Sequence, residues 1–395
     1  MTVATPLKML RFMESLVLVV LALATLGSFI PSIPGLGELG PSLISPYGPW
    51  VTILLIAGAV VNFHRMRKTS DKRSFIILAL AVFAAIGSSF IQAKQVGVAR
   101  DNGVSVDFAQ TLLPQSQKDD HLPRLIFAYG AYEGASLPLE IYRPASEREG
   151  ALAPVLVYIH GGGWAAQTLR QREADYRWFT DRGYVVISLE YSLSSQERHL
   201  WNIVQPQLGC ALAWVGMNAA RFGGDVSRLA LWGESAGGNL VLNVSYMANN
   251  GTLEPSCAGT LPQIAATVSL YPVVDLARAY RNDDVIIGRF GKMMAIGYAG
   301  GSPEEVPERY AYVSSSNHIS AAAPPTLLIV PESDHLVAPD AAYAFATQAR
   351  SAGVDMRLIR MPYAEHAFDL TVGSIGNQLV RQATLHFLEE HGLKP

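Results

Sequence analysis

The chain has 395 residues, of which half are hydrophobic and 16% are charged, against about 25% charged residues in ordinary soluble domains. This apolar content excludes an intrinsically disordered protein, and two cysteines exclude a disulfide-dense scaffold. A net charge of −3 gives no reason to expect a nucleic-acid partner. Residues 1–100 hold nine Lys/Arg and three Asp/Glu, whereas residues 101–395 hold 21 and 30. We therefore expect two differently built domains, 1–100 and 101–395.

Three uncharged apolar stretches, residues 15–33, 42–63 and 74–93, fill the first part of the chain. A helix needs about 20 residues to cross the hydrocarbon core of a bilayer, and each stretch is long enough. Inside lipid a helix satisfies its own backbone polar groups, so the stretches predict three transmembrane helices. The alternatives are a cleaved signal peptide and buried helices of a soluble domain. Two further spans argue against the first, and the absence of charge over about 20 residues argues against the second.

The orientation of this anchor follows from its basic residues. Lys8 and Arg11 precede the first stretch, and residues 64–73 between the second and third stretches carry five Lys/Arg. Basic loops stay in the cytoplasm. We therefore expect a multi-pass protein of the cell membrane with residues 101–395 on the extracytoplasmic side.

The second part alternates short apolar runs with amphipathic stretches. Short, nearly continuous apolar runs are typical of strands buried on both faces, and their alternation with helices predicts an α/β fold with a mostly parallel sheet. Residues 271–325 interrupt the alternation, and a connection of this length suggests a cap over a site. The expected strands are 137–142, 155–159, 185–189, 229–232, 266–270, 326–330 and 356–359, and the expected helices are 172–182, 208–221, 238–248, 340–351 and 376–391.

The strongest chemical motif is Gly233-Glu234-Ser235-Ala236-Gly237, which fits G-x-S-x-G. It stands between an expected strand and an expected helix, which is the context that a nucleophile elbow requires. Larger side chains two residues on either side of Ser235 would collide with backbone in so tight a turn. Ser235 is therefore the predicted nucleophile.

A second motif, residues 160–164, reads His-Gly-Gly-Gly-Trp directly after an expected strand. Acyl transfer needs preorganised N–H donors for the oxyanion, and glycines let backbone amides approach it. We expect the amides of Gly162, Gly163 and Ala236 to form this oxyanion hole. The alternative is a flexible turn, which the downstream elbow disfavours.

From about residue 125 to 391 the chain resembles the α/β-hydrolase superfamily, specifically its hormone-sensitive-lipase-like and feruloyl-esterase-like carboxylesterases. The resemblance rests on the motifs at 160–164, 191–193, 222–225 and 233–238, which stand in the family's order. It implies an α/β-hydrolase fold, here preceded by three transmembrane helices. The lipase-like relatives read Tyr-Arg-Leu-Ala-Pro where residues 191–195 read Tyr-Ser-Leu-Ser-Ser, so the resemblance leaves the substrate open.

In this fold the catalytic acid and histidine follow the serine in that order. His366 lies in a loop after the last expected strand and resembles the family's His-Gly-Phe loop, with Ala367 in place of glycine. Asp334 lies just past the preceding strand, where the family has its acid. Glu332 and Asp340 are its rivals, although Asp340 reads more simply as a helix N-cap.

These residues together predict a serine hydrolase that cleaves small-molecule or lipid carboxylic esters. An acyltransferase would use the same residues with an envelope or lipid acceptor, and a non-catalytic binding protein would keep the fold alone. The spacing of His, Cys and Asp gives no metal-ligand pattern, so we expect neither metal nor cofactor. Sequence alone leaves open whether Cys210 and Cys257 form a disulfide, and it leaves the oligomeric state open.

Overall fold

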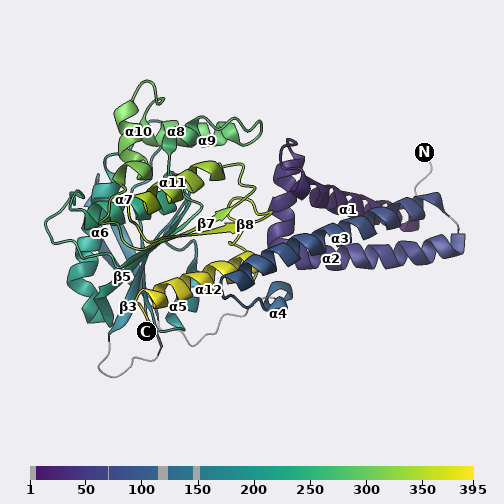
Figure 1. The fold of residues 1–395 in the computed structure, drawn as a ribbon, viewed down its shortest axis with the longest axis horizontal. Coiled ribbons are helices and arrows are strands. Elements are labelled where there is room, and N and C mark those ends of the chain that lie inside the picture. The colour runs from purple at the N-terminus through teal and green to yellow at the C-terminus, as the bar shows by residue number, and fades with distance from the viewer. Residues whose placement is uncertain (1–5, 70, 114–122, 146–151) are drawn as a thin grey trace. The chain divides into compact units, whose positions relative to one another are not determined.

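The computed structural model describes residues 6–69, 71–113, 123–145 and 152–395 (Figure 1). The chain forms two compact units. We call them the helical unit and the sheet unit. The helical unit comprises Met1–Gln115, Pro331–Asp334 and Met361–Val380, and the sheet unit comprises Ser116–Val330, His335–Arg360 and Arg381–Pro395. The division near residue 100 stays a prediction, and the helical unit also holds two segments from the second part of the chain.

Three long helices form most of the helical unit. They are α1 (Pro6–Phe29), α2 (Leu36–Thr69) and α3 (Lys72–Asp101), and in the described part of the chain all three are long and apolar enough to cross a membrane. The helices predicted from the apolar stretches are thus confirmed, with shifted ends. Helix α1 ends four residues before Ile33, because Ile30 precedes Pro31 and a residue before proline is disfavoured in the helical region.

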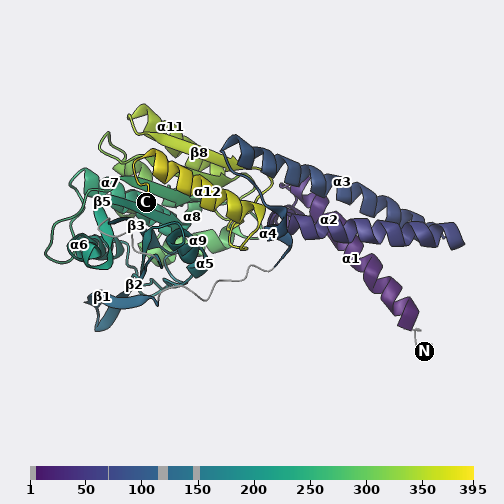
Figure 2. The ribbon, with the colours of Figure 1, turned by 90° about the horizontal axis from the view of Figure 1, so that it is seen from below.

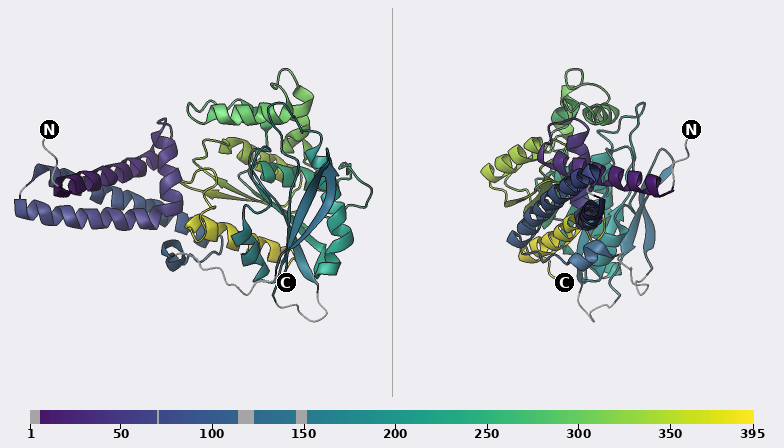
Figure 3. Two further views of the ribbon diagram at one scale, coloured as in Figure 1. Left: turned by 180° about the vertical axis from the view of Figure 1, so that it is seen from behind. Right: turned by 90° about the vertical axis from the view of Figure 1, so that its right-hand side faces the viewer.

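Helix α2 is longer than its apolar stretch and contains Pro41, Pro46 and Pro49. Proline removes a helical hydrogen bond and its ring clashes with the carbonyl four residues earlier, so prolines bend helices. Figures 1 and 3 show the first part of α2 turned away from the direction of the rest.

Small and polar residues bring the three helices together. A Cβ added at Gly40 in α2 would collide with the backbone of Ser28 in α1, and such small residues let membrane helices approach closely. Between α2 and α3, the Thr52 hydroxyl donates to Ser88 Oγ at 2.9 Å and accepts from Gln92 Nε2 at 2.7 Å. Large apolar side chains such as Phe83, 70% exposed, cover the outside of the helices.

The sheet unit is built on an eight-stranded sheet of order β1-β2-β4-β3-β5-β6-β7-β8 among the described residues. Strands β3 to β7 pair in parallel, whereas β2 pairs antiparallel with β1 and with β4. The predicted mostly parallel α/β sheet is therefore confirmed. The strands are β1 (Leu125–Tyr132), β2 (Ala135–Tyr142), β3 (Ala153–Ile159), β4 (Val185–Leu189), β5 (Gly224–Glu234), β6 (Ala266–Leu270), β7 (Thr326–Pro331) and β8 (Met356–Met361).

Helices cover both faces of this sheet (Figures 1 and 2). Successive strand residues point to opposite faces. Val157 therefore packs in the core shared with α6 and α7, whereas the Tyr158 ring packs at a tilt against the rings of Tyr176 in α5 and Trp232, each 5.0 Å away. The main helices are α5 (Glu173–Thr180), α6 (Val204–Asn218), α7 (Ala236–Asn249), α11 (Pro339–Ser351) and α12 (Ile375–Glu390), with a 3₁₀ turn η1 (Ala219–Phe222). The short α4 (Phe108–Leu112) belongs to the helical unit.

The stretch between β6 and β7 forms a small helical insertion. It contains α8 (Leu276–Tyr280), α9 (Gly288–Ala299), α10 (Pro307–Val313) and the 3₁₀ turn η2 (Ser315–His318). Elsewhere in the sheet unit, Cys210 of α6 is bonded to Cys257, with their Cα atoms 5.5 Å apart. The pairing that sequence left open is thus present in the structure.

Candidate active site

Ser235 occupies the turn between β5 and α7, with φ 54° and ψ −120°. A residue with a Cβ rarely adopts positive φ, because that backbone conformation is strained. Such strain persists only where the surrounding structure enforces it. The Ser235 amide donates to the carbonyl of Leu270 at 2.9 Å, and its carbonyl accepts from Asn239 in α7. The turn is therefore fixed on both sides, as a nucleophile elbow requires.

The glycines that flank Ser235 are sterically required. A Cβ at Gly233 would lie 2.5 Å from the Gly237 carbonyl oxygen and 2.9 Å from that of Ile159. A Cβ at Gly237 would collide with the carbonyl of Ile159 and lie 2.5 Å from that of His160. Since these neighbours are backbone atoms, they cannot move aside as a flexible side chain would. The collision expected from the sequence is thus present.

The glycine loop 161–163 lies against the serine. A Cβ at Gly161 would come within 3.3 Å of the Ser235 Cβ. Gly162 and Gly163 have φ of 90° and 60°, a region that glycine adopts without strain. Ala236, the first residue of α7, is fully buried. The role of these three amides as oxyanion donors stays a prediction.

Three residues outside the predicted site hold the glycine loop. The buried His160 ring contacts Glu190 Oε1 through Nε2 at 2.8 Å and stacks on Tyr191 at 4.3 Å. Burial raises the pKa of Tyr191 well above its usual range, so its hydroxyl stays protonated and donates to the carbonyls of His160 and Gly161 at 3.0 Å each. The contact between His160 and Glu190 could have been inferred from the sequence. The two residues directly follow β3 and β4, and the ends of parallel neighbouring strands meet at one edge of the sheet.

A buried ionic network holds Glu234, the residue before the predicted nucleophile Ser235. Arg172 bonds Glu234 Oε2 at 2.5 Å and Asp175 Oδ2 at 2.7 Å. Arg381 bonds the other oxygen of Asp175 at 2.6 Å, and all four side chains are at most 8% exposed. Removing one partner of such a buried pair costs about 3–5 kcal/mol, because the remaining charge is left uncompensated. Sequence reasoning missed this network, since its members are far apart in the chain.

The predicted acid and histidine are in direct contact. Nδ1 of His366 lies 2.8 Å from Oδ2 of Asp334. The Asp334 side chain is fully buried, and that of His366 is 14% exposed. Their loops are joined by backbone hydrogen bonds, from Glu332 N to Met361 O and from Ser333 N to Ala364 O.

The rival acids lie in different surroundings. Glu332 and Asp340 are both exposed. Asp340 forms an ion pair with Arg278 at 3.2 Å. The expectation that it is the N-cap of its helix is wrong: the N-cap of α11 is Ala338, and Pro339 takes the first helical position. Proline is favoured there because its missing N–H has no helical partner in any case.

Ala367 marks the departure from the resembled family's glycine. Its φ is 61°, a conformation that glycine adopts freely and alanine only under strain. The backbone thus keeps the shape that a glycine would favour.

The six predicted site residues are divided between the two units. Ser235, Ala236, Gly162 and Gly163 belong to the sheet unit, and Asp334 and His366 belong to the helical unit. Their cooperation in one active site stays a prediction.

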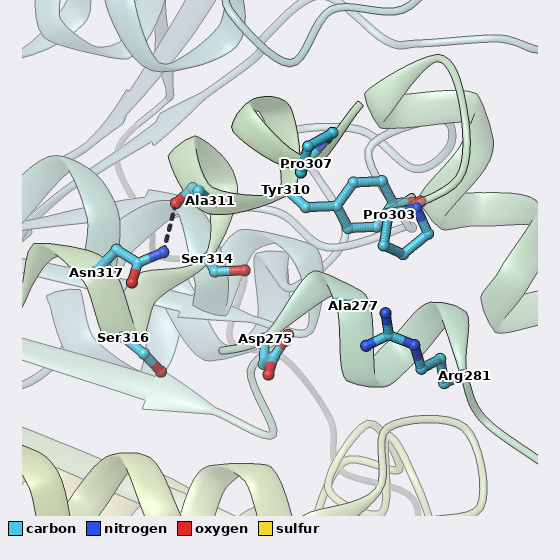
Figure 4. A pocket seen from close by; sticks show the side chains of 10 residues that line it. All are labelled: Asp275, Ala277, Arg281, Pro303, Pro307, Tyr310, Ala311, Ser314, Ser316 and Asn317. Carbon is cyan, nitrogen blue, oxygen red and sulfur yellow. Dashed lines mark hydrogen bonds between the residues drawn. The ribbon is translucent and has the colours of Figure 1, made fainter. Parts of the chain in front are cut away.

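The insertion carries a pocket of about 310 Å³ (Figure 4). Asp275, Arg281 and Tyr310 are among its ten lining residues, which do not include the predicted site residues. Arg281 is paired with Glu304 at 2.8 Å, and Asp275 caps α8. Within 6–69, 71–113, 123–145 and 152–395, no group of three or more His, Cys, Asp or Glu side chains is placed to hold a metal ion.

Comparisons with known proteins agree with this architecture. The family model named BD-FAE matches residues 139–348, just over half of the chain. Esterase LipQ of Mycobacterium tuberculosis is 28% identical over 63% of this chain and 58% of its own length. Carboxylesterase NlhH of the same species is 29% identical over 71% of this chain and 84% of its own length.

Solved structures show the same fold. Esterase 2 of Thermogutta terrifontis with bound butyrate is 25% identical, with a TM-score of 0.57 over 68% of this chain and 95% of its own. The matched region spans less than two thirds of LipQ and of the probable carboxylic ester hydrolase LipM, at 58% and 60%. The chain therefore belongs to the BD-FAE family and has an α/β-hydrolase fold.

Proposed function

We propose that this protein is a carboxylic ester hydrolase with Ser235 as its nucleophile. The observation that carries the proposal is the strained backbone of Ser235, at φ 54°, in a turn where both flanking glycines are sterically required. Strain of this kind is kept at functional sites. The relatives support the proposal, since those described above are named as esterases.

In the proposed reaction, Ser235 Oγ attacks the acyl carbon while His366 accepts the hydroxyl proton. Asp334 engages Nδ1 of His366, so Nε2 is the nitrogen that takes this proton and then gives it to the leaving alcohol. Asp334 also stabilises the imidazolium. The amides of Gly162, Gly163 and Ala236 hold the oxyanion, and water then releases the acid from the acyl-enzyme.

Labelling with a fluorophosphonate tests this proposal. The full chain in detergent should form one covalent adduct, on the peptide that contains Ser235, as read by mass spectrometry. Pre-incubation with p-nitrophenyl butyrate should slow labelling, and heat-denatured protein should not react, because activation needs the folded site. The butyrate named for the Thermogutta esterase makes this the first ester to try. A native protein that stays unlabelled at Ser235 contradicts the proposal.

The insertion is the proposed source of acyl specificity. Helix α9 contacts the glycine loop: a Cβ at Gly163 would collide with the Met294 side chain, and Tyr298 stacks on Trp164 at 4.5 Å. Substitution of Met294 is therefore the first change to make when ester chain lengths are compared.

We also propose that α1, α2 and α3 anchor the protein in the membrane, with residues 101–395 outside the cytoplasm. The apolar outer surface of the helices supports the anchor, and the five basic residues in 64–73 support the orientation. The disulfide between Cys210 and Cys257 suits an oxidising compartment.

Protease treatment of sealed cells tests the orientation. We expect residues 101–395 to be degraded on the outside, while residues 64–73 stay intact until the cells are permeabilised. Immunoblotting with one epitope tag inserted between α2 and α3 and one at the C-terminus reads both results. Protection of the C-terminal tag in sealed cells would reverse the orientation.

A further inference from the structure

The long helices contact the chain segment that leads to His366. Tyr363, three residues before His366, packs against the core of the three helices. Its ring lies 5.4 Å from that of Phe29 in α1 and 6.4 Å from that of Phe90 in α3. Phe29 and Phe90 are themselves 6.1 Å apart, so the three rings form one cluster. All of these contacts lie within the helical unit.

A buried amide holds the neighbouring residue. Gln95 of α3 is fully buried, and its Nε2 donates to Ser45 Oγ of α2 and to the carbonyl of Pro362, both at 3.1 Å. A buried donor without a partner is costly. The bond from Gln95 therefore fixes the Pro362 carbonyl relative to both helices.

The backbone between these contacts and the histidine has little freedom. Tyr363 has φ 55°, a strained conformation that surrounding contacts must maintain. On its other side the segment is bonded to the acid loop, from Ser333 N to Ala364 O. The segment is thus held by the helices at 362–363 and by the acid loop at 364.

A second attachment lies further along the chain. The Asp107 amide, just after α3, donates to Gln378 Oε1 at 2.7 Å, and Gln378 Nε2 donates back to the Asp107 carbonyl at 2.9 Å. Gln378 lies in α12. Residues on both sides of His366 therefore bond to the N-terminal part of the chain, Pro362 before it to Gln95 and Gln378 after it to Asp107.

We propose that α1, α2 and α3 position the imidazole of His366, and that Phe29, Phe90, Gln95 and Tyr363 are positioning residues for catalysis. The helices are then part of the active-site scaffold as well as a membrane anchor. This inference rests on the proposed function, in which His366 is the general base. A displacement of about 1 Å at a catalytic group lowers turnover by about 100-fold. Loss of these contacts should therefore lower kcat strongly while changing KM little.

The test uses the full chain in lipid nanodiscs with p-nitrophenyl butyrate. Tyr363→Ala and Gln95→Leu should each lower kcat by about 10- to 100-fold with KM changed by less than about threefold. Tyr363→Phe keeps the ring and should restore turnover. Phe83→Ala, at a side chain 70% exposed on the outside of α3, is the matched control and should leave kcat unchanged. Full turnover in both Tyr363→Ala and Gln95→Leu overturns the proposal.

A second measurement separates this proposal from the proposed function. The rate at which diethyl pyrocarbonate modifies His366, read by mass spectrometry, reports the setting of the imidazole without any turnover. We expect it to rise at least threefold in Tyr363→Ala and in Gln95→Leu, and to stay unchanged in Tyr363→Phe and Phe83→Ala. If wild-type protein has no esterase activity, the proposed function fails while this rate still decides the inference. If the modification rate is unchanged in both Tyr363→Ala and Gln95→Leu, the inference is wrong. If Tyr363→Ala does not fold, the rate in Gln95→Leu alone decides the inference.

Discussion

Replacing Ser235 by alanine is expected to lower kcat for p-nitrophenyl butyrate by about 10⁵- to 10⁶-fold. Alanine has no hydroxyl to attack the acyl carbon, so the acyl-enzyme cannot form. The rate that remains should exceed that of uncatalysed hydrolysis in water, because the oxyanion donors and substrate binding still act. Release of p-nitrophenol measures the loss.

The fold should survive this change. Alanine and serine both have a Cβ, so φ 54° strains them equally, and the melting temperature should stay within about 2 °C. Ser235→Gly is the matched variant: it should be equally inactive but more stable by about 1 kcal/mol, because the relief of about 1–3 kcal/mol of backbone strain exceeds the entropic cost of glycine, about 0.5–1 kcal/mol. Undiminished turnover by either variant would remove Ser235 from the mechanism.

The sequence predicted the centre of the sheet better than its margins. The bounds of β4 and β6 equal the expected runs 185–189 and 266–270, because a strand buried on both faces is a continuous apolar run. Strand β5 begins five residues before its expected start, since its polar beginning pairs with Ala153 and Pro154 of β3. That pairing depends on a distant segment, which local patterns do not report.

Strand β1, at the edge of the sheet, was not among the expected strands. Its residues alternate between exposed and partly buried apart from the buried Tyr129, and its register shifts between Ala128 and Gly130. Glycine and bulges both weaken a strand pattern. The sequence signal of β1 is therefore weak, whereas the strand at the other edge, β8, begins at its expected first residue, Met356.

In the candidate site, too, local features were predictable from the sequence and contacts with distant segments were not. The elbow around Ser235 was predictable because its requirements are local: two glycines, a strand before and a helix after. The partners of the motif were not predictable, since Arg172 and Glu234 are 62 residues apart. Contacts of Gln95 with a loop 267 residues away were equally hidden. Motifs report the chemistry, whereas the packing that positions it is a tertiary property.

Replacing Asp334 by asparagine is expected to lower kcat by about 10⁴-fold while leaving the shape of the site intact. Asparagine has nearly the same size as aspartate, and its amide can still bond Nδ1 of His366. An amide N–H that donates to Nδ1 favours the tautomer protonated at Nε2, which cannot accept the proton of Ser235. The neutral amide also fails to stabilise the imidazolium. Steady-state kinetics with p-nitrophenyl butyrate should show the loss in kcat, with KM changed by a small factor.

Glu332→Gln and Asp340→Asn are the matched controls, because these residues were the rival acids in the sequence. Both are exposed, and Asp340 pairs with Arg278 on the surface, where an ion pair is worth about 0–1 kcal/mol. Each control should therefore retain kcat within about threefold and unfold at nearly the wild-type temperature. If Asp334→Asn stays active and one of the controls loses kcat by about 10⁴-fold, the residue changed in that control is the catalytic acid. The 2.8 Å contact between Asp334 and His366 would then have a structural role only.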